Sequence, residues 1–510
     1  MDTVRGSRFG AERGQSSVLM HRRCKILYVT PEIADFVKVG GLGDVSAALT
    51  RALRRHCDVR VVIPGYRAVL RSFRSMSIVG RLDGLASVPP CEIAEVRTTD
   101  GLIVYVLLAA ELYDRDGSPY GNSQAADWPD NDIRFARLAL AAADMAGGRA
   151  QMRWQPDLLH LNDWPTALAA GYAKWRNLAV PSLFTIHNLA YQGVFPAERL
   201  QRLGIPPDAF NIEGVEYYGN VSFLKAGIAF ASEINTVSPT YAREITTPQF
   251  GCGLDGLLRL RAEQGRLTGI INGIDDSWDP NTGHCLASPF NAQDLSGKGK
   301  NAEQIRAAFK LAVSRGPLFA VVSRLVHQKG LDLIIGSAEE IVGSGGQIAI
   351  MGEGEPQVEA QLGDLARRHS GSIALKLGFD EGEARRMFAG SDFLLMPSRF
   401  EPCGLSQMYA QRFGSLPIAR RTGGLVDSIE DGLTGFLFRT PSIDGCRDAI
   451  GRALNVFRHS EIFASMRRLA MARNFSWSSS ALSYESAYAR TIQGRVGSEA
   501  AWDDGYSAPA

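Results

Sequence analysis

The chain has 510 residues, 45% of them hydrophobic, which is too long for one ordinary core and predicts two or three domains. Its 55 Lys and Arg residues balance 54 Asp and Glu residues, which excludes a global basic field and argues against nucleic acid or membrane as a partner. The seven cysteines are scattered and form no Cys-x-x-Cys pair, which argues against a disulfide scaffold or a zinc site and favours a reducing cytoplasm.

The first 24 residues contain several arginines but no apolar segment. This composition argues against a secretory signal and predicts a disordered extension. The longest apolar run, residues 102–110, has about half the length of a membrane span and predicts a buried strand instead.

Residues 25–30 predict a strand that is buried on both faces, and an amphipathic helix follows the glycine-rich loop after it. Glycines at 40 and 41 let backbone approach a ligand, and Lys38 supplies a mobile charge, which together suit a diphosphate. The alternative is a tight turn with a solvated lysine. The loop matches neither the dinucleotide fingerprint nor the P-loop, and the strand at 59–63 ends without the acidic residue that a nicotinamide cofactor requires, which argues against a dehydrogenase.

Two further strands end in polar residues, at Asp163 and at His187. The carboxyl ends of consecutive parallel strands meet at one edge of a sheet, so these side chains are candidates for holding hydroxyl groups and for proton transfer. For either residue alone, a structural hydrogen bond is the alternative. Downstream, Ser238 is expected to cap a helix.

Residues 270–275 are expected to end the first sheet, and the polar stretch from there to 316 to cross between domains. A strand at 317–323 then leads into a turn that Arg324 and Lys329 flank. Two fixed cations at the end of a strand can neutralise a departing diphosphate, so no metal is required. The alternative is a solvated basic loop.

Residues 391–438 predict two strand-turn-helix units in succession, which implies a parallel sheet with its ligands at the carboxyl ends of the strands. The first turn contains Glu401, and the second contains Thr422, Gly423 and Gly424. A carboxylate accepts hydrogen bonds from hydroxyls, and helix-start amides hold phosphate oxygens. The alternative is that Glu401 caps a helix and the glycines only turn the chain.

Several segments in the right order resemble glycosyltransferase family 5, the bacterial glycogen synthases and plant starch synthases. The resemblance spans residues 25 to about 492 and includes KVGGL (38–42), HLNDW (160–164), TIHN (185–188), SRLVHQKGLD (323–332) and RFEPCGLSQMYAQRFGSLPIARRTGGL (399–425). It implies an α/β chain with two Rossmann-like domains facing each other across a cleft, the GT-B glycosyltransferase fold. The expected divisions are an extension (1–24), an acceptor-side domain (25–271), a nucleotide-sugar-binding domain (272–475), a helix crossing back to the first domain (476–495) and a flexible tail (496–510).

The resemblance also implies the activity, which is retaining transfer of glucose from ADP-glucose to the non-reducing end of glycogen or another α-1,4-glucan. No covalent nucleophile, metal or cofactor is expected. Same-face attack through an oxocarbenium-like ion pair is the favoured family mechanism, with the leaving phosphate taking the acceptor proton. UDP-glucose as donor and a catalytically silent glucan-binding homologue are the alternatives. The implied catalytic residues are Arg324, Lys329, Glu401, His187 and Asp163; the donor-binding residues are Lys38, Gly40, Gly41, Asn188, Asn272, Cys403, Thr422, Gly423 and Gly424; acceptor or peripheral residues are Glu32 and Tyr120.

Overall fold

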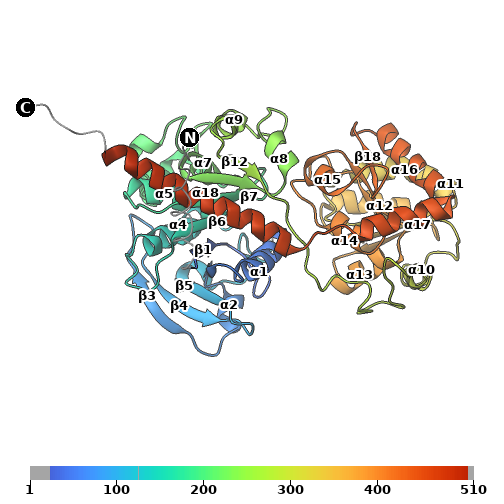
Figure 1. Ribbon diagram of the computed structural model, residues 1–510, viewed down its shortest axis with the longest axis horizontal. Helices are drawn as coiled ribbons and strands as arrows, with labels where there is room; N and C mark the ends of the chain where they lie inside the picture. The colour runs from blue at the N-terminus through green and yellow to red at the C-terminus, as the bar shows by residue number, and fades with distance from the viewer. Residues whose placement is uncertain (1–22, 125, 504–510) are drawn as a thin grey trace, which may run out of the picture.

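The computed structural model describes residues 23–124 and 126–503, and these residues form two α/β domains that lie side by side (Figure 1). The chain passes from the first domain to the second after the strand β12 (Leu267–Gly269), and it returns just before the helix α18 (Trp477–Asp503). The predicted extension at 1–24 lies outside the described residues except for its last two.

The first domain is built on a large sheet that is parallel except at one edge. The fully buried strands at its centre have helices on both faces, as the continuous apolar runs predict. Only β4 and β3 run antiparallel to their neighbours within the described part of this sheet. In spatial order, its described strands are β12, β11 (Glu233–Thr236), β7 (Ser182–Ile186), β6 (Leu158–Asn162), β1 (Lys25–Val29), β2 (Asp58–Pro64), β5 (Ile103–Leu108), β4 (Cys91–Arg97) and β3 (Ser77–Leu82).

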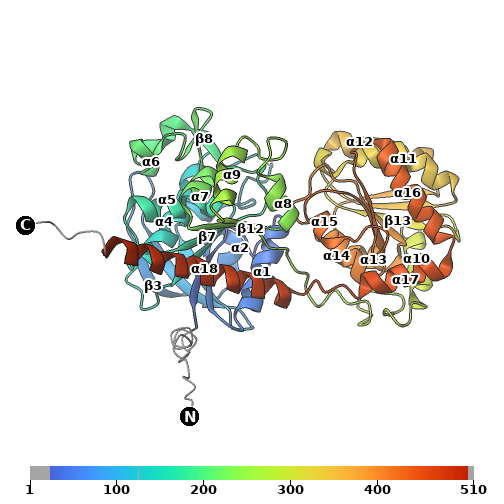
Figure 2. The ribbon, with the colours of Figure 1, turned by 45° about the horizontal axis from the view of Figure 1, so that its top comes forward.

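Every residue of α4 (Asn131–Ala146) is buried, and this helix packs against α3 (Ala110–Tyr113), α5 (Trp164–Trp175) and α6 (Leu200–Leu203) of the first domain. A small antiparallel sheet, β8 (Val194–Pro196), β10 (Asn220–Ser222) and β9 (Glu216–Tyr217), lies at the top of the domain in Figure 2. The remaining described helices of this domain are α1 (Gly41–Leu53), α2 (Arg67–Arg71), α7 (Phe223–Phe230), α8 (Pro239–Glu244) and α9 (Asp255–Glu263), with short 3₁₀ helices η2 (Ala197–Arg199) and η3 (Pro207–Ala209).

The second domain has a wholly parallel sheet with a separate hydrophobic core on each face. Successive residues of β13 point to opposite faces, so Phe319 packs in one core and Ala320 in the other. The described strands, in spatial order, are β15 (Ile373–Leu377), β14 (Gln347–Gly352), β13 (Leu318–Val322), β16 (Phe393–Met396), β17 (Leu416–Arg420) and β18 (Phe436–Phe438). The helices are α10 (Gly297–Ala308), η4 (His327–Lys329), α11 (Leu331–Gly343), α12 (Pro356–Arg368), α13 (Glu381–Gly390), α14 (Ser406–Arg412), α15 (Gly423–Ser428), α16 (Ile443–Phe457) and α17 (Ser460–Met471).

The strand order of each sheet determines where a ligand can bind. In the first sheet β1 lies between β6 and β2, and in the second β13 lies between β14 and β16. Strand order reverses at each of these points, and such switch points leave a crevice at the carboxyl ends of the strands. The loops that follow β1, β6, β13 and β16 are therefore the natural places for a site.

The C-terminal helix α18 crosses the first domain in both ribbon views (Figures 1 and 2). It is anchored through a buried hydrogen bond of 2.8 Å between the hydroxyl of Tyr488 and His160 Nδ1, and Ser480 donates to the carbonyl of Ile271 at 2.8 Å. Near the same junction, Val237, Ile274, Cys403 and Phe475 share a small apolar cluster that joins both domains.

Three sequence predictions differ from the structure. The first sheet ends at Gly269, so residues 270–275 are already outside it. The polar crossing stretch contains α10, because Ile305 and Phe309 are buried and the ammonium of Lys298 donates to the carbonyls of Ala389 and Phe413, each at 2.8 Å. Residues 496–503 of the expected flexible tail continue α18, and the rest of the tail lies outside the described residues.

Candidate functional site

An interdomain cavity of about 1110 Å³ lies at the carboxyl ends of both sheets. The loops that follow β1, β6 and β7 form one side, and those that follow β13 and β16 form the other. Twelve of the predicted site residues line it: Glu32, Gly40, Gly41, Tyr120, Asp163, His187, Asn188, Asn272, Arg324, Lys329, Glu401 and Cys403. Lys38, Thr422, Gly423 and Gly424 are not among its lining residues.

On the second-domain side, Lys329 and Glu401 form an ion pair. The ammonium lies 2.6 Å from Glu401 Oε2, which also accepts a hydrogen bond of 2.9 Å from Ser398 Oγ. Both side chains are largely buried, with exposed fractions of 15% and 7%. Gly330 makes this proximity possible, because its φ is 66° and a side chain there would collide with the carbonyl of Pro397 at the end of β16.

Arg324 is the second cation of the cavity. It follows β13, and its Nη1 lies 3.4 Å from the hydroxyl of Tyr191 on the opposite domain. Because this guanidinium is solvent-exposed whereas Lys329 is enclosed, the two cations border the cavity at different depths. As predicted, both cations flank the turn that follows one strand, and the structure adds the contact between Lys329 and Glu401, which follows β16.

On the first-domain side, Asp163 has a backbone conformation that residues other than glycine rarely adopt. Its φ is 55° and its ψ is −179°, and such strain is concentrated at functional sites. Its Oδ1 accepts from the amides of His187 at 2.8 Å and Asn188 at 3.4 Å. Burial raises the pKa of Asp163 to about 7, the nearby charge of Glu32 adds to this rise, and the two amides oppose it.

His187 is neutral at physiological pH, because burial lowers its pKa to about 3. Its Nε2 lies 2.9 Å from Asn162 Oδ1. The side-chain nitrogen of Asn162 donates to the carbonyl of Val29 at 2.9 Å, which fixes the amide orientation and makes Nε2 the protonated nitrogen. Nδ1 is then a hydrogen-bond acceptor, suited to a hydroxyl group of a ligand.

Glu32 lines the cavity, but its carboxylate is committed to the first domain's own loop. Oε2 accepts from the amides of Val39 at 2.7 Å and Gly40 at 3.1 Å, and Oε1 accepts from the hydroxyl of Tyr120 at 3.0 Å. The Gly40 amide therefore already has an acceptor in this structure, and its predicted contact with a diphosphate stays a prediction. Lys38 also has a partner, since its ammonium lies 2.8 Å from Asp44 Oδ2.

The turn at Thr422–Gly424 forms a contact between the domains. The amide of Gly423 donates to both carboxylate oxygens of Glu244, at 3.0 and 3.1 Å, and the hydroxyl of Thr422 donates to the same group at 3.0 Å. The amide of Gly424 donates to the carbonyl of Glu401 at 3.1 Å. These amides already have acceptors in this arrangement of the domains, and their phosphate-binding role stays a prediction. No sequence signal marks Glu244, which ends α8 of the first domain.

Two donor-side candidates lie at the junction of the domains. Asn272 is buried, and its Oδ1 has no hydrogen-bond partner among the described residues. An unpartnered buried acceptor on a cavity is a candidate to receive a ligand hydroxyl. Cys403 is buried in the apolar junction cluster, and burial raises the pKa of its thiol to about 12, so it stays protonated.

The sequence interpretation assigned no role to several aromatic and polar side chains that also line the cavity. They come from the first domain, and their only sequence signal is their position within or beside the family-like segments; they are Trp128, Trp164, Tyr191, Gln192, Phe195 and Tyr217. Ser238 caps α8 as predicted, accepting from the amide of Tyr241 at 3.2 Å, and its hydroxyl also donates to the carbonyl of Pro402 at 2.6 Å.

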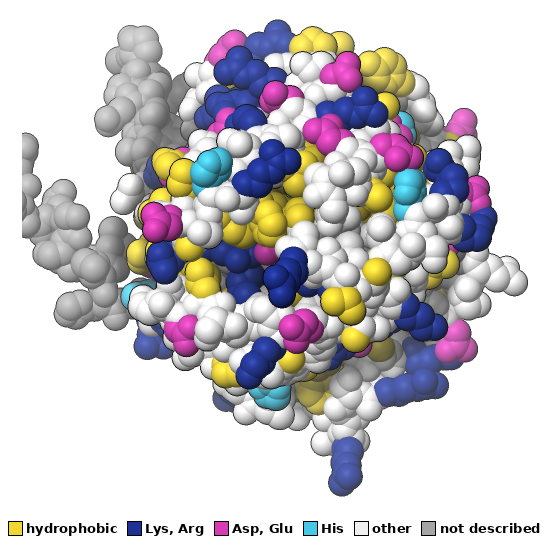
Figure 3. Space-filling model, turned by 90° about the vertical axis from the view of Figure 1, so that its right-hand side faces the viewer, with side chains coloured by type: hydrophobic (Ala, Val, Ile, Leu, Met, Phe, Trp, Pro, Cys, Tyr) yellow, Lys and Arg dark blue, Asp and Glu magenta, His cyan; other side chains and the backbone are white. Residues whose placement is uncertain are grey.

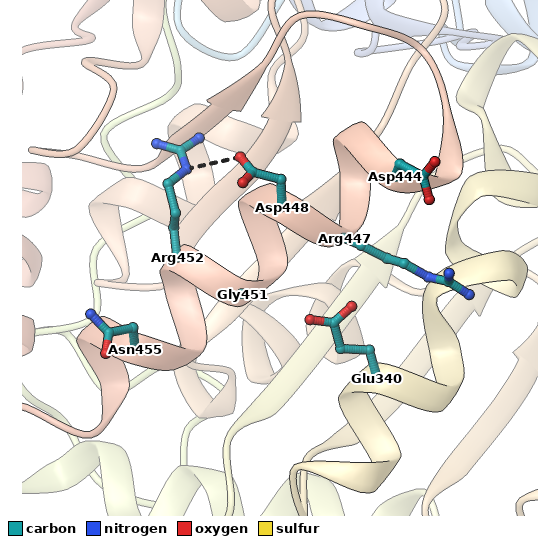
Figure 4. A pocket seen from close by; sticks show the side chains of 7 residues that line it. All are labelled: Glu340, Asp444, Arg447, Asp448, Gly451, Arg452 and Asn455. Carbon is teal, nitrogen blue, oxygen red and sulfur yellow. Dashed lines mark ion pairs between the residues drawn. The ribbon is translucent and has the colours of Figure 1, made fainter.

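A second hollow, of about 530 Å³, lies on the outer surface of the second domain between α11 and α16 (Figure 4). Both arginines of this hollow have partners, since Arg452 Nε lies 3.5 Å from Asp448 Oδ2 and Arg447 donates to the carbonyl of Gly336 at 2.6 Å. Charges of both signs are also interspersed across the end of this domain (Figure 3). Because no predicted site residue lines this hollow, the interdomain cavity is the candidate site.

Across residues 23–124 and 126–503, no cluster of three or more His, Cys, Asp or Glu side chains has the arrangement of a metal site. In the same part of the chain, no helix combines the length and apolarity needed to traverse a bilayer.

Known proteins resemble this chain over both domains. Residues 25–260 match the starch synthase catalytic domain family, and residues 303–464 match the glycosyl transferases group 1 family. A glycogen synthase of Pseudomonas putida is 58% identical over 89% of this chain and 87% of the relative. Glycogen synthase 1 of Bradyrhizobium diazoefficiens is 56% identical over 89% of this chain and 98% of the relative.

Solved structures agree with this result. The catalytic domain of starch synthase IV from Arabidopsis thaliana, bound to ADP and acarbose, has a TM-score of 0.80 and 32% identity, covering 92% of this chain and 100% of that one. A sucrose-phosphate synthase from Thermosynechococcus elongatus shares the fold, with a TM-score of 0.56 and 16% identity over 93% of this chain and 100% of that one. With two parallel-sheet domains around one cavity, the chain belongs to the glycogen and starch synthase family of glycosyltransferases and has its GT-B fold.

Proposed function

We propose that this enzyme transfers glucose, with retention, from ADP-glucose to the non-reducing 4-hydroxyl of glycogen or another α-1,4-glucan. The observation that supports this best is the composition of the interdomain cavity. It places two cations and a carboxylate of the second domain opposite Asp163 and His187 of the first. A nucleotide sugar has a diphosphate for the cations and hydroxyls for the carboxylate and the histidine.

Arg324 and Lys329 stabilise the departing diphosphate. Both line the cavity after the switch-point strand β13, where ligands of parallel sheets bind. Guanidinium forks and ammonium groups that are already in place stabilise developing negative charge without reorganisation. Lys38 does not line the cavity, and the amides of Gly40, Gly423 and Gly424 have acceptors in this arrangement of the domains, so the proposal gives the main diphosphate contacts to Arg324 and Lys329.

The sugar of the donor lies between the domains. The carboxylate of Glu401 accepts hydrogen bonds from two hydroxyls of the sugar. The ion pair with Lys329 keeps this carboxylate oriented. His187 Nδ1 accepts a hydrogen bond from another hydroxyl of the sugar. Asn188 and the unpartnered Oδ1 of Asn272 contact the opposite side of the same sugar. These groups are neutral or paired, as a polyhydroxyl ligand requires.

Asp163 positions the acceptor hydroxyl. Its carboxylate faces the cavity from a strained backbone, and the amides of His187 and Asn188 fix one of its oxygens. No side chain is assigned as a covalent nucleophile. The acceptor attacks on the face that the diphosphate leaves, and a leaving phosphate oxygen takes the acceptor proton, which retains the anomeric configuration.

A transfer assay tests the proposal directly. Radiolabelled ADP-glucose and UDP-glucose are supplied in parallel with glycogen, and label in the polymer is measured at initial rate. We expect faster incorporation from ADP-glucose and little change when a chelator is added. Faster incorporation from UDP-glucose would overturn the donor assignment, and no incorporation from either donor would favour a silent glucan-binding protein.

A further inference from the structure

A tyrosine at the tip of a hairpin is the most conspicuous exposed side chain beside the interdomain cavity. β9 and β10 are joined by Tyr218 and Gly219, whose φ angles are 47° and 78°. Two-residue hairpin turns with positive φ at both positions favour Asn, Asp or Gly, and a bulky side chain there is strained. Tyr218 is nevertheless 75% exposed, so packing within the domain does not account for its presence.

The ring of Tyr218 is held in place by its surroundings. It lies edge-on to the ring of Tyr217, with centroids 4.8 Å apart and an angle of 87° between the planes. Tyr217 donates to the carbonyl of Cys252 at 2.7 Å. Gly253 lies under the pair, since an added Cβ would come within 3.0 Å of the Tyr218 hydroxyl. Beyond these contacts most of the Tyr218 side chain is exposed, so a ligand can stack on its ring.

The hairpin is continuous with the cavity through Tyr217, Gln192 and Cys252, which line it. Gln192 is 8% exposed and donates to the Cys252 carbonyl at 3.0 Å, and its Oε1 has no partner among the described residues. A buried amide oxygen without a partner is costly unless a ligand donor reaches it. A hydroxyl group of a ligand that extends from the cavity towards the hairpin is such a donor.

The charge of this side of the cavity determines which ligand fits. Among the described lining residues, Lys and Arg come only from the second domain, as Arg324 and Lys329. The first-domain side provides aromatic rings, amides and carboxylates, which suit a neutral chain with many hydroxyls rather than a phosphate. The apolar C–H face of a sugar ring can stack on an exposed aromatic face, while its rim of hydroxyls reaches polar groups.

We propose that Tyr217, Tyr218 and Gln192 form a subsite for the acceptor glucan at a sugar unit distant from the reacting end. This inference rests on the proposed function. A sugar ring of the acceptor stacks on Tyr218, and one of its neighbours donates a hydroxyl to Gln192 Oε1. The subsite holds long acceptors during transfer and leaves donor binding unaffected.

The test uses the full-length enzyme and the variant Tyr218→Asn, because Asn suits the turn and removes only the ring. We expect the KM for glycogen and for maltoheptaose to rise about 3- to 10-fold, as loss of one aromatic contact implies. The KM for ADP-glucose, and the rate with a saturating acceptor, should stay at the wild-type value. Tyr218→Phe, which keeps the ring, should match the wild type.

Phe379→Asn is the matched control, since Phe379 is an aromatic residue of the second domain that is 60% exposed and does not line the cavity. An unchanged glycogen KM in Tyr218→Asn would overturn the inference, and so would an equal rise in Phe379→Asn. If the wild type transferred glucose to no acceptor, the proposed function itself would fail. Normal transfer with no effect of Tyr218→Asn would overturn only the subsite.

Discussion

The chain has two turns with paired glycines beside the site, and a carboxylate accepts hydrogen bonds from backbone amides at each of them. At Gly40 the carboxylate is Glu32, from the same loop of the first domain. At Gly423 it is Glu244, which belongs to the other domain and lies 179 residues away in sequence. The first arrangement is therefore part of one domain, whereas the second exists only while the two domains keep this relative position.

The comparison shows why a glycine turn alone does not identify a phosphate site. An amide binds a phosphate only if no other acceptor occupies it, and the competing carboxylate can come from anywhere in the fold. At both turns the amides already have an acceptor, and Arg324 and Lys329 are the only Lys or Arg among the described residues that line the cavity, which is why the proposed function assigns the diphosphate to these two side chains.

The largest effect is expected from Arg324. Replacing it with Ala removes a cation at the point where the leaving diphosphate gains charge, so kcat should fall by about 10²- to 10³-fold or more. Since the side chain is exposed, the melting temperature should stay at the wild-type value. Arg324→Lys should recover part of the rate, because it restores the charge without the bidentate fork. Near-normal turnover in purified Arg324→Ala would refute the phosphate role.

The turn within the first domain should respond strongly to loss of its carboxylate. Glu32→Ala leaves the amides of Val39 and Gly40 and the hydroxyl of Tyr120 without their acceptor. Val39 and Gly40 are exposed, so water can replace the carboxylate at their amides, whereas the hydroxyl of Tyr120 is partly buried. An unsatisfied buried donor costs about 1–3 kcal/mol, and a loss of about 1 kcal/mol lowers the melting temperature by about 2–4 °C. Thermal denaturation of the purified variant measures this shift.

The interdomain turn should respond differently. Glu244→Ala leaves the buried amide of Gly423 and the buried hydroxyl of Thr422 without an acceptor while the domains are docked. Separation of the domains gives both groups water as a partner without opening either core, so the melting temperature should change by less than about 2 °C. The domains should instead separate more easily, which small-angle scattering would detect as a larger radius of gyration. Asp427→Ala is a second variant of the same kind. It removes the neighbouring interdomain contact to Thr240, at 2.7 and 2.8 Å, and should also increase the radius of gyration. Equal melting temperatures for Glu32→Ala and Glu244→Ala would contradict the claim that the first turn stabilises one domain and the second only the docking of the two domains.

Asp163 is a third carboxylate that accepts from amides, and its charge should affect stability in a pH-dependent way. Its pKa rises from 3.8 to about 7 on folding, so the folded state favours the protonated form. The associated stability is present below the unfolded pKa, declines as pH rises towards 7, and is lost above it. Asp163→Asn has no charge to bury, so its melting temperature should exceed that of the wild type by about 2 °C or more at about pH 8, and by less at about pH 5. A difference that is the same at both pH values would contradict the raised pKa.

The sequence predicted the parts of the fold that depend on local pattern. The apolar runs at 393–396 and 416–419 are the strands β16 and β17, and the parallel sheet that they imply is present. Arg324 and Lys329 follow β13 and Glu401 follows β16, and these two strands are neighbours at the point where the strand order reverses. All three side chains therefore line the same cavity. The family assignment from the ordered motifs is confirmed by the relatives.

What the sequence could not predict depends on contacts between distant residues. α10 contains few apolar positions, and it is held by a buried lysine whose acceptors are carbonyls of other elements. Glu244 meets Gly423 only through the docking of two domains. Residue spacing and composition likewise do not predict the strained backbone of Asp163. They also do not predict that the side-chain oxygens of Gln192 and Asn272 have no hydrogen-bond partner among the described residues. The catalytic roles assigned to individual residues stay predictions.

The central claim is that cations of the second domain allow a nucleoside diphosphate to leave glucose, and Lys329 tests it most directly because it lies in the cavity against Glu401. The decisive measurement is the initial rate of glucose transfer from ADP-glucose into glycogen by the wild type and by Lys329→Ala, with folding checked by melting temperature. We expect a folded variant whose turnover falls by about 10²-fold or more. A folded Lys329→Ala enzyme with wild-type turnover would contradict the account.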